Sequence, residues 1–244
     1  MSPSAAHLNT LYAVAFNASN SNGYLFAIDV TNGIPSVRTS FTFIGRSGAS
    51  PVVVKPTQSG LTSPLVLLHS PEATTASQAK HRLLGLLDNG IQILPAWSLS
   101  LNQSMSVAPA FDQTSRSIYV QADNGPTLLR VDINTGRVLN TYNIKSIGAF
   151  PLGFKLNGHL VATRSSTGFT LLLSGSVGQG TQIGQHVMAF APLVNAKKLL
   201  WRQKIFASPE EYTGAWNLAP ASSQSKLFCP VVMGPLSGLT LLCD

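Results

Sequence analysis

Charged residues are scarce in this sequence, and their scarcity excludes several classes of protein. Only 10% of the 244 residues are Asp, Glu, Lys or Arg, against about 25% in ordinary soluble proteins. Long helices and coiled coils need many Glu, Lys and Arg residues, as does disorder driven by charge, so these classes are excluded. No apolar run approaches ~18 residues, so no transmembrane segment is expected. A chain of this length forms one large β domain or two small domains.

Negative charge is scarcer than positive charge. Sixteen Lys and Arg residues against nine Asp and Glu residues give a formal net charge of +7. The positive residues are scattered except at 197–204, where they surround Trp201, and this cluster is interpreted as a solvated turn and strand. Domains that bind nucleic acids gather positive charge on one face. We therefore expect no nucleic-acid partner.

The sequence contains only two cysteines, Cys229 and Cys243, on either side of the turn-rich segment Gly234–Gly238. A hairpin centred on Leu236 would place them opposite each other. They are then either two buried thiols on paired strands or a cross-strand disulfide, which would require an oxidising compartment. The first residues have neither the basic nor the apolar region of a secretory signal. The chain is therefore either cytoplasmic or a piece of a longer secreted, luminal or periplasmic precursor.

Signals for helices are nearly absent, and only Ser208–Tyr212 resembles a helix start. Short apolar runs alternate with clusters of Gly, Pro, Asn and Ser, which is the pattern of many short strands. One unit shows the order most clearly: a first strand, two further strands, an aspartate, a turn that ends in glycine, and a fourth strand. Its parts are Val107–Phe111, Ile118–Gln121, Leu128–Val131, Asp132, Asn134–Gly136 and Arg137–Tyr142. The chain is therefore expected to be all-β.

The same order recurs along the chain, which predicts a repeat architecture. An aspartate closes the third strand in every unit but the fourth, where Ala191 takes its place; these aspartates are Asp29, Asp88, Asp132 and Asp244. Units of about 40–50 residues with four strands are typical of β-propeller blades, each of which buries its apolar face against the next. We predict one propeller domain over 1–244, made of four-stranded antiparallel blades. The approximate blades are 2–49, 50–106, 107–149, 150–216 and 217–244.

Two features depart from a regular propeller. The second and fourth units carry insertions at Ser70–His81 and Ser174–Gln185, between their second and third strands, and these would project from one face. The fifth unit stops before its fourth strand. We therefore expect about five units with the last incomplete, either as a three-stranded blade or because the chain is a fragment of a larger propeller.

These units resemble the quinoprotein-type (PQQ-like) β-propeller repeat. The matching segments are Ala108–Tyr142, Leu25–Asp29, Thr31–Gly33, Val187–Phe190 and Leu200–Arg202. The resemblance implies that Trp97 and Trp201 occupy the outer-strand position that packs between blades. It also implies how a cofactor would be held, since quinoprotein dehydrogenases use adjacent cysteines, a stacked tryptophan and calcium-binding acids. No two cysteines adjoin here, so no cofactor is expected.

Candidate catalytic groups are few. The aspartates occupy turn positions, and Glu72, Glu210 and Glu211 lie in an insertion or a connecting loop, so we expect no opposed carboxylate pair of the kind that glycosidases use. None of the five histidines shows the spacing of metal ligands. The glycine-rich segment Ser174–Thr181 lacks the lysine of a phosphate-binding loop. We assign no catalytic, cofactor-binding or metal-binding residue.

These observations favour a non-catalytic scaffold that binds a protein or peptide partner through one face of the propeller. Similar PQQ-like propellers serve in outer-membrane assembly scaffolds and in luminal domains of the endoplasmic reticulum, which is an analogy of fold alone. The candidate binding residues are Tyr212 and Trp216, together with the two inserted loops. The alternative is a degenerate quinoprotein-like or carbohydrate-active enzyme, or a sugar-binding propeller.

Overall fold

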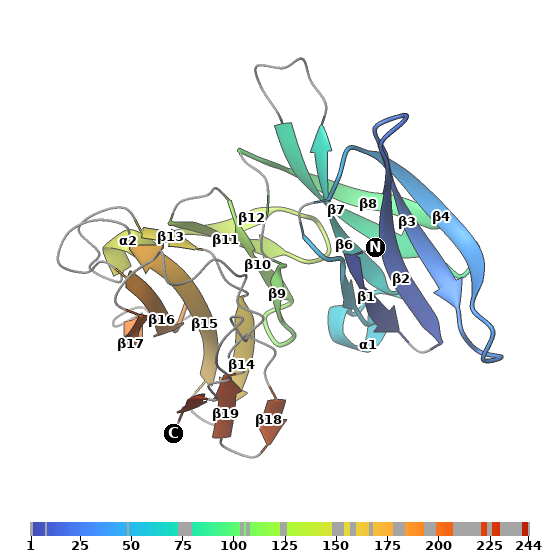
Figure 1. The fold of residues 1–244 in the computed structure, drawn as a ribbon. Coiled ribbons are helices and arrows are strands. Elements are labelled where there is room, and N and C mark those ends of the chain that lie inside the picture. The colour runs from blue at the N-terminus through green and yellow to red at the C-terminus, as the bar shows by residue number, and fades with distance from the viewer. Residues whose placement is uncertain are drawn as a thin grey trace. The chain divides into compact units, whose positions relative to one another are not determined.

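The computed structural model describes most of the chain, and nearly all of its regular structure is β-strand (Figure 1). The described residues are 2–7, 9–47, 49–72, 80–102, 105, 108–122, 126–147, 154–156, 160–165, 168–177, 184–192, 199–206, 221–223, 226–229 and 241–243. They belong to two compact units, one made of Met1–Asp123 and Leu129–Thr141 and the other of Asn124–Leu128 and Tyr142–Asp244. The strands form five sheets in chain order, which we call blades 1 to 5.

Blades 1 and 2 are four-stranded meanders in which each strand pairs antiparallel with the next. Blade 1 consists of β1 (Ser2–His7), β2 (Thr10–Asn17), β3 (Asn22–Asp29) and β4 (Ser36–Ile44). Blade 2 consists of β5 (Val52–Val54), β6 (Leu65–Glu72), β7 (Lys80–Asp88) and β8 (Ile93–Leu101). A one-turn helix, α1 (Pro56–Ser59), separates β5 from β6. Its proline stands at the first helical position, where a missing N–H costs no hydrogen bond.

Blade 3 belongs mostly to the first compact unit, and only the start of β11 and the end of β12 are assigned to the second. Its strands, which lie in the order β12-β11-β10-β9, are β9 (Ala110–Asp112), β10 (Ser117–Gln121), β11 (Thr127–Asp132) and β12 (Val138–Asn143). The helix α2 (Ile144–Ile147) follows them. Every residue of β10 is buried, as expected for a strand in the interior of a sheet that is covered on both faces.

Blades 4 and 5 depart from the four-stranded pattern. Blade 4 consists of β13 (Phe154–Leu156), β14 (Val161–Ser165), β15 (Gly168–Val177), β16 (Gly184–Phe190) and β17 (Leu199–Phe206). The long strand β15 pairs with β13 near one end and with β14 near the other. The described residues of blade 5 form three strands, β18 (Ala221–Ser223), β19 (Lys226–Cys229) and β20 (Leu241–Cys243). The incomplete fifth unit expected from the sequence is therefore confirmed.

The two predicted insertions are shorter than the sequence suggested. Ser174–Val177 complete β15 and pair with the start of β16, so only 178–183 of the expected insertion lies outside the described residues. In blade 2, β6 continues to Glu72 and β7 begins at Lys80. The prediction failed because glycine and serine residues are typical of loops, whereas backbone hydrogen bonds between strands do not depend on side-chain polarity.

The aspartates of the repeat occupy equivalent places. Asp29, Asp88 and Asp132 each end the third strand of their blade. In each, Oδ1 accepts a hydrogen bond from the backbone N–H two residues ahead, at 2.8 to 3.0 Å. Gly33 and Gly136 then close two of these turns with φ of 73° and 70°, a conformation that glycine adopts without steric cost. The local turn chemistry predicted from the sequence is confirmed in these three blades.

The fourth strands of three blades share a one-residue bulge. In the pairing with the third strand, Arg38, Ala96 and Leu200 are each skipped between two consecutive pairs. The residue after each bulge faces a small residue, and in blade 2 this pair is Trp97 and Gly85. A bulge turns the strand locally and re-aims the side chains beside it. In blades 1 and 2, Arg38 at the bulge and Trp97 just after it make hydrogen bonds to the next blade.

Trp97 attaches blade 2 to blade 3. Its indole N–H donates a 2.9 Å hydrogen bond to the carbonyl oxygen of Ile133, and only 8% of the residue is exposed. The ring lies against Gly85 of its own blade and against Gly136 of the next blade, so closely that a Cβ on either glycine would clash with it. The expectation that Trp97 packs between blades is confirmed. The same hydrophobic core contains Leu83, Ile118 and other residues of both blades.

Candidate functional site

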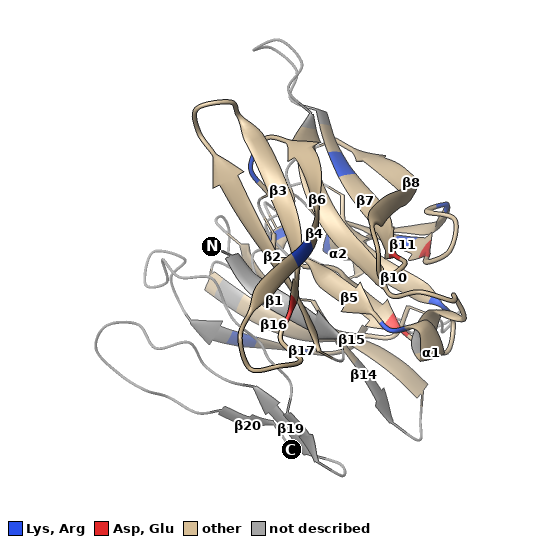
Figure 2. Ribbon diagram, turned by 90° about the vertical axis from the view of Figure 1, so that its right-hand side faces the viewer, with Lys and Arg blue, Asp and Glu red and all other residues tan. Residues whose placement is uncertain are grey.

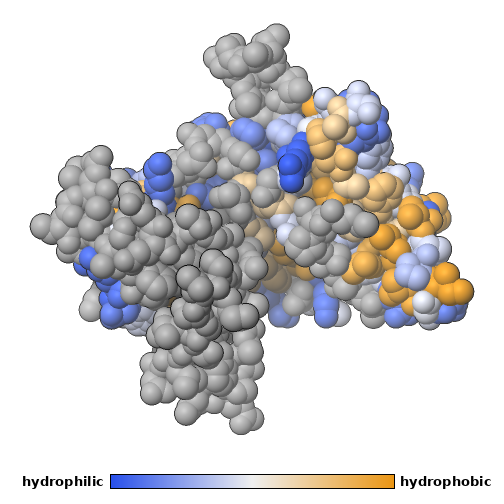
Figure 3. Space-filling model, in the orientation of Figure 1, coloured by the Kyte–Doolittle hydropathy of each residue, from blue (hydrophilic) through white to orange (hydrophobic). Residues whose placement is uncertain are grey.

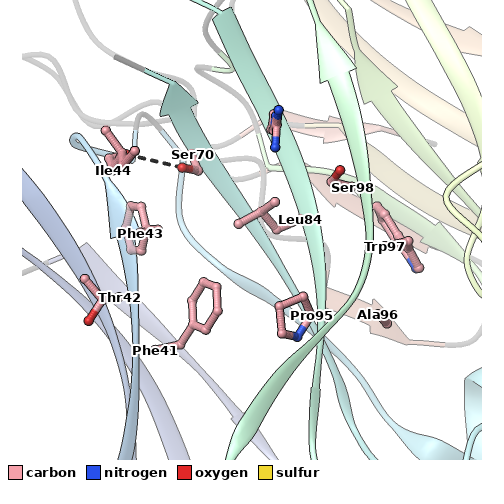
Figure 4. A pocket seen from close by; sticks show the side chains of 11 residues that line it. Phe41, Thr42, Phe43, Ile44, Ser70, Leu84, Pro95, Ala96, Trp97 and Ser98 are labelled. Carbon is pink, nitrogen blue, oxygen red and sulfur yellow. Dashed lines mark hydrogen bonds between the residues drawn. The ribbon is translucent and has the colours of Figure 1, made fainter. Parts of the chain in front are cut away.

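A groove of about 410 Å³ lies between blades 1 and 2, beside their fourth strands (Figure 4). Strand β4 forms one wall, and it packs against β6 and β8 of blade 2. Phe41 and Phe43 of β4 face Leu84 and Pro95 of blade 2 across the groove. The full lining is Phe41, Thr42, Phe43, Ile44, Ser70, Arg82, Leu84, Pro95, Ala96, Trp97 and Ser98.

The groove combines apolar walls with a single charged residue. Arg82 is the one charged side chain among the lining residues, and none of them is acidic. The Ser70 hydroxyl is already used, because it donates to the carbonyl oxygen of Ile44 at 3.2 Å. Strand β4 pairs only with β3 among the described strands, so its other edge offers backbone N–H and C=O groups beside the groove. An unpaired edge next to apolar pockets is the arrangement that binds extended peptides.

A second pocket, of about 370 Å³, lies at the other end of β4 and contains a buried ion pair. The guanidinium of Arg38 donates two hydrogen bonds to the Asp88 carboxylate, one to Oδ1 at 3.0 Å and one to Oδ2 at 2.5 Å. The Tyr12 hydroxyl donates to Oδ2 at 2.6 Å. The full lining is Thr10, Tyr12, Arg38, Thr62, Ser63, Pro64, Asp88, Asn89 and Gly90.

The charges of this cluster are mutually satisfied. Burial alone would raise the pKa of Asp88, but the hydrogen bonds from Arg38, Tyr12 and the Gly90 amide outweigh it and hold that pKa below its usual value. The hydrogen bond to Asp88 raises the pKa of Arg38. Burial, followed by the hydrogen bond to Asp88, raises the pKa of Tyr12. The hydroxyl is therefore no general base at neutral pH, and the cluster acts as a clamp between blades 1 and 2.

Two histidines that are twelve residues apart in the sequence lie together in blade 2. His69 Nε2 is 3.3 Å from His81 Nδ1, and their rings are nearly parallel. His69 Nε2 also accepts a hydrogen bond from the Met105 amide at 3.4 Å. Because that amide can only donate, Nε2 carries no proton and the ring is neutral. Burial and then the nearby His81 lower the pKa of His69 to about 4, and burial also lowers that of His81.

Sequence reasoning missed this histidine pair, since the two residues show no metal-ligand spacing. The register of β6 and β7 brings the two histidines together. It places His81 opposite Pro71, which is two residues from His69 on β6. No group of three or more His, Cys, Asp or Glu residues lies close enough to hold a metal ion, as far as the described part of the chain extends. The pair alone does not make a metal site. It places the buried, titratable side chain of His69 beside that of His81.

The binding residues expected from the sequence, Tyr212 and Trp216, lie outside the described residues. So do the central parts of both inserted loops, at 73–79 and 178–183. The groove between blades 1 and 2 was not expected, because its walls come from strands that are distant in sequence. These assignments to Tyr212 and Trp216 stay predictions.

The strands that carry the two cysteines pair antiparallel, as expected, but in a different register. Cys243 is opposite Leu227, and Cys229 is opposite Leu241. The two cysteines are therefore two positions out of direct register, whereas the predicted hairpin placed them opposite each other. A disulfide favours Cα atoms within about 7 Å, and diagonal positions across a strand pair lie about 7–8 Å apart. This register therefore disfavours a disulfide between Cys229 and Cys243. The side chains of both cysteines lie outside the described part of the structure.

Charged residues are scattered over the described part of the chain, whereas hydrophobic residues gather on part of its surface. Figure 2 shows Lys and Arg residues scattered over the described ribbon without a continuous stripe. Figure 3 shows hydrophobic residues gathered over the first blade, and the exposed ones include Val30, Ile34 and Val37. Within the described residues, no helix is both long and apolar enough to cross a membrane.

Comparisons with known proteins identify the fold. No family model matches the chain, and no curated protein matches it. Among solved structures, BamB from Moraxella catarrhalis superimposes with a TM-score of 0.54 at 11% sequence identity, over 93% of this chain and 53% of that one. The WD40 domain of Toxoplasma gondii coronin gives 0.43 at 10% identity, over 94% of this chain and 64% of that one.

The chain is an all-β propeller of four-stranded antiparallel blades, with the last of five units incomplete. It spans about half the length of the BamB structure. At this level of identity the likeness concerns the fold alone, and the function must be argued from the site.

Proposed function

We propose that this chain is a PQQ-like propeller that acts as a non-catalytic scaffold and binds an extended segment of a protein partner. The groove between blades 1 and 2 carries the proposal. Its aromatic and aliphatic walls suit apolar side chains, and the open edge of β4 suits the backbone of an added strand. Side chains alternate in direction along a strand, so every second residue of the segment would enter the groove.

The lining of the groove defines the partner further. Most of its residues are apolar, and none is acidic. The preferred ligand is therefore an extended peptide with apolar residues at alternate positions.

Selection from a random peptide library tests this proposal with the purified chain as bait. We expect the selected peptides to share the alternating apolar pattern and to bind with micromolar affinity in calorimetry. The variant Thr42→Arg places a bulky charge at an exposed position of the groove wall and should weaken binding at least tenfold, to above ~10 µM.

Ser40→Arg is the matched control, since Ser40 is exposed on the same strand and does not line the groove. It should bind the peptides as the original chain does. Equal binding by the Thr42→Arg and Ser40→Arg variants would refute the proposal.

A further inference from the structure

Trp97 shows what covers the tryptophan of an outer strand in this protein. The covering segment is the turn of the next blade, Asp132–Gly136, which offers a bare glycine to the ring and the Ile133 carbonyl oxygen to the indole N–H. With this turn in place, Trp97 is 8% exposed. A backbone hydrogen bond fixes this turn, since the Ile133 N–H donates to the Arg116 carbonyl oxygen at 3.0 Å.

Trp201 has a similar construction in blade 4, but among the described residues it remains more exposed. It follows the bulge at Leu200 and pairs with a small residue, Ala189, as Trp97 follows Ala96 and pairs with Gly85. Yet Trp201 is 40% exposed and Leu200 is 45% exposed. Both apolar side chains are therefore accessible to a partner.

Blade 1 carries a turn similar to the one that covers Trp97, although its Gly33 N–H bonds to the Val30 carbonyl oxygen, whereas the Gly136 N–H bonds to that of Asp132. Asp29–Gly33 has the same length as Asp132–Gly136, and its glycine has nearly the same φ. A backbone hydrogen bond likewise fixes its second residue, since the Val30 N–H donates to the Asn9 carbonyl oxygen at 2.8 Å. No atom outside the immediate neighbours lies within 4 Å of the place where a Cβ on Gly33 would stand.

The surroundings of this turn suit an apolar contact. Ile34 is 79% exposed and Val30 is 36% exposed. The Val30 carbonyl oxygen accepts one hydrogen bond, from the Gly33 N–H at 3.3 Å, and a carbonyl oxygen has a second lone pair for an indole N–H. The turn of blade 2 is less suitable, because its Asp88 is engaged by Arg38 of blade 1.

We propose that two copies of this chain associate through Trp201 of one copy and the Asp29–Gly33 turn of the other. The exposed tryptophan lies on Gly33 and donates to the Val30 carbonyl oxygen, as Trp97 does with Gly136 and Ile133. The two surfaces differ, so the contact is heterologous and repeats head to tail, either closing into a ring or extending into a longer assembly. This self-association goes beyond the proposed peptide binding and uses none of the groove residues.

Sedimentation experiments on the full chain at about 1 to 200 µM test the proposal, since small interfaces bind in the micromolar range. We expect the average mass to rise with concentration. Trp201→Glu and Ile34→Glu should each raise the dissociation constant at least tenfold. Their matched controls are Gln203→Glu, at an exposed position of the same strand, and Ile91→Glu, at the corresponding turn residue of blade 2. Both controls should associate as the original chain does.

A mixture of two variants distinguishes this contact from a symmetric one. Trp201→Glu leaves the turn intact and Ile34→Glu leaves the tryptophan intact, so the mixed sample should regain heterodimers that neither variant forms as homodimers. Thermal unfolding of each variant checks that it is folded. A chain that stays monomeric up to the highest concentration overturns the proposal, as does an association that both variants leave unchanged, or a mixture that forms no heterodimer.

Discussion

The clamp between blades 1 and 2 should make a large, measurable contribution to stability. The Asp88 side chain is 1% exposed, and it accepts hydrogen bonds from Arg38, Tyr12 and the Gly90 amide. Replacing Arg38 by methionine removes the positive charge and keeps much of the side-chain length. The carboxylate then stays buried with two neutral donors, and its own charge has no counterpart.

The size of the effect follows from how deeply each partner is buried. Removing one partner of a buried ion pair costs about 3–5 kcal/mol. The Arg38 side chain retains 23% exposure, so water already screens part of the interaction and the lower end applies. We expect Arg38→Met to lower the free energy of unfolding by about 3 kcal/mol. Arg137→Met, at an exposed position without an ion pair among the described residues, should change it by less than about 0.5 kcal/mol.

A double-mutant cycle separates the ion pair from simple loss of packing. Asp88→Asn removes the negative charge, so once it is present, Arg38→Met no longer leaves a buried charge alone. Denaturant unfolding at pH 7 should therefore give a coupling free energy of at least about 1 kcal/mol between the two changes. Additive losses, with a coupling near zero, would refute the argument that a charge-charge contact joins the two blades.

Two further predictions concern blade 2 and its junction with blade 3. His69 has a pKa of about 4 in the folded chain and about 6.5 when unfolded, so the unfolded state binds more protons below pH 6.5. Stability should fall by up to about 3 kcal/mol from pH 6.5 to pH 4, and His69→Gln should remove this part of the pH dependence in denaturant titrations. Gly136→Ala should destabilise the chain more than Gly33→Ala. Both impose a similar backbone strain of about 1–2 kcal/mol, but only the first drives a Cβ into the Trp97 ring; equal melting temperatures for the two variants would contradict this.

Local chemistry explains why much of the fold was predictable. An aspartate followed by a glycine turn needs only neighbouring residues to form its hydrogen bonds, so the repeat at Asp29, Asp88 and Asp132 could be found in the sequence. The second half of β15, Ser174–Val177, was assigned to an insertion because its serine and glycine residues give no apolar pattern and are held by backbone pairing with β16. The place of Trp97 between blades followed from its position in the repeat unit.

The class of fold, the repeat and the turns follow from the order of the residues, because these features depend on residues that are close together in the chain. Which side chains meet between blades depends instead on how the sheets pack. Arg38 reaches Asp88, fifty residues away, because a bulge redirects it, and the groove exists because β4 packs against β6 and β8. Such contacts depend on the register and bulges of whole sheets, which cooperative packing sets and no short segment encodes.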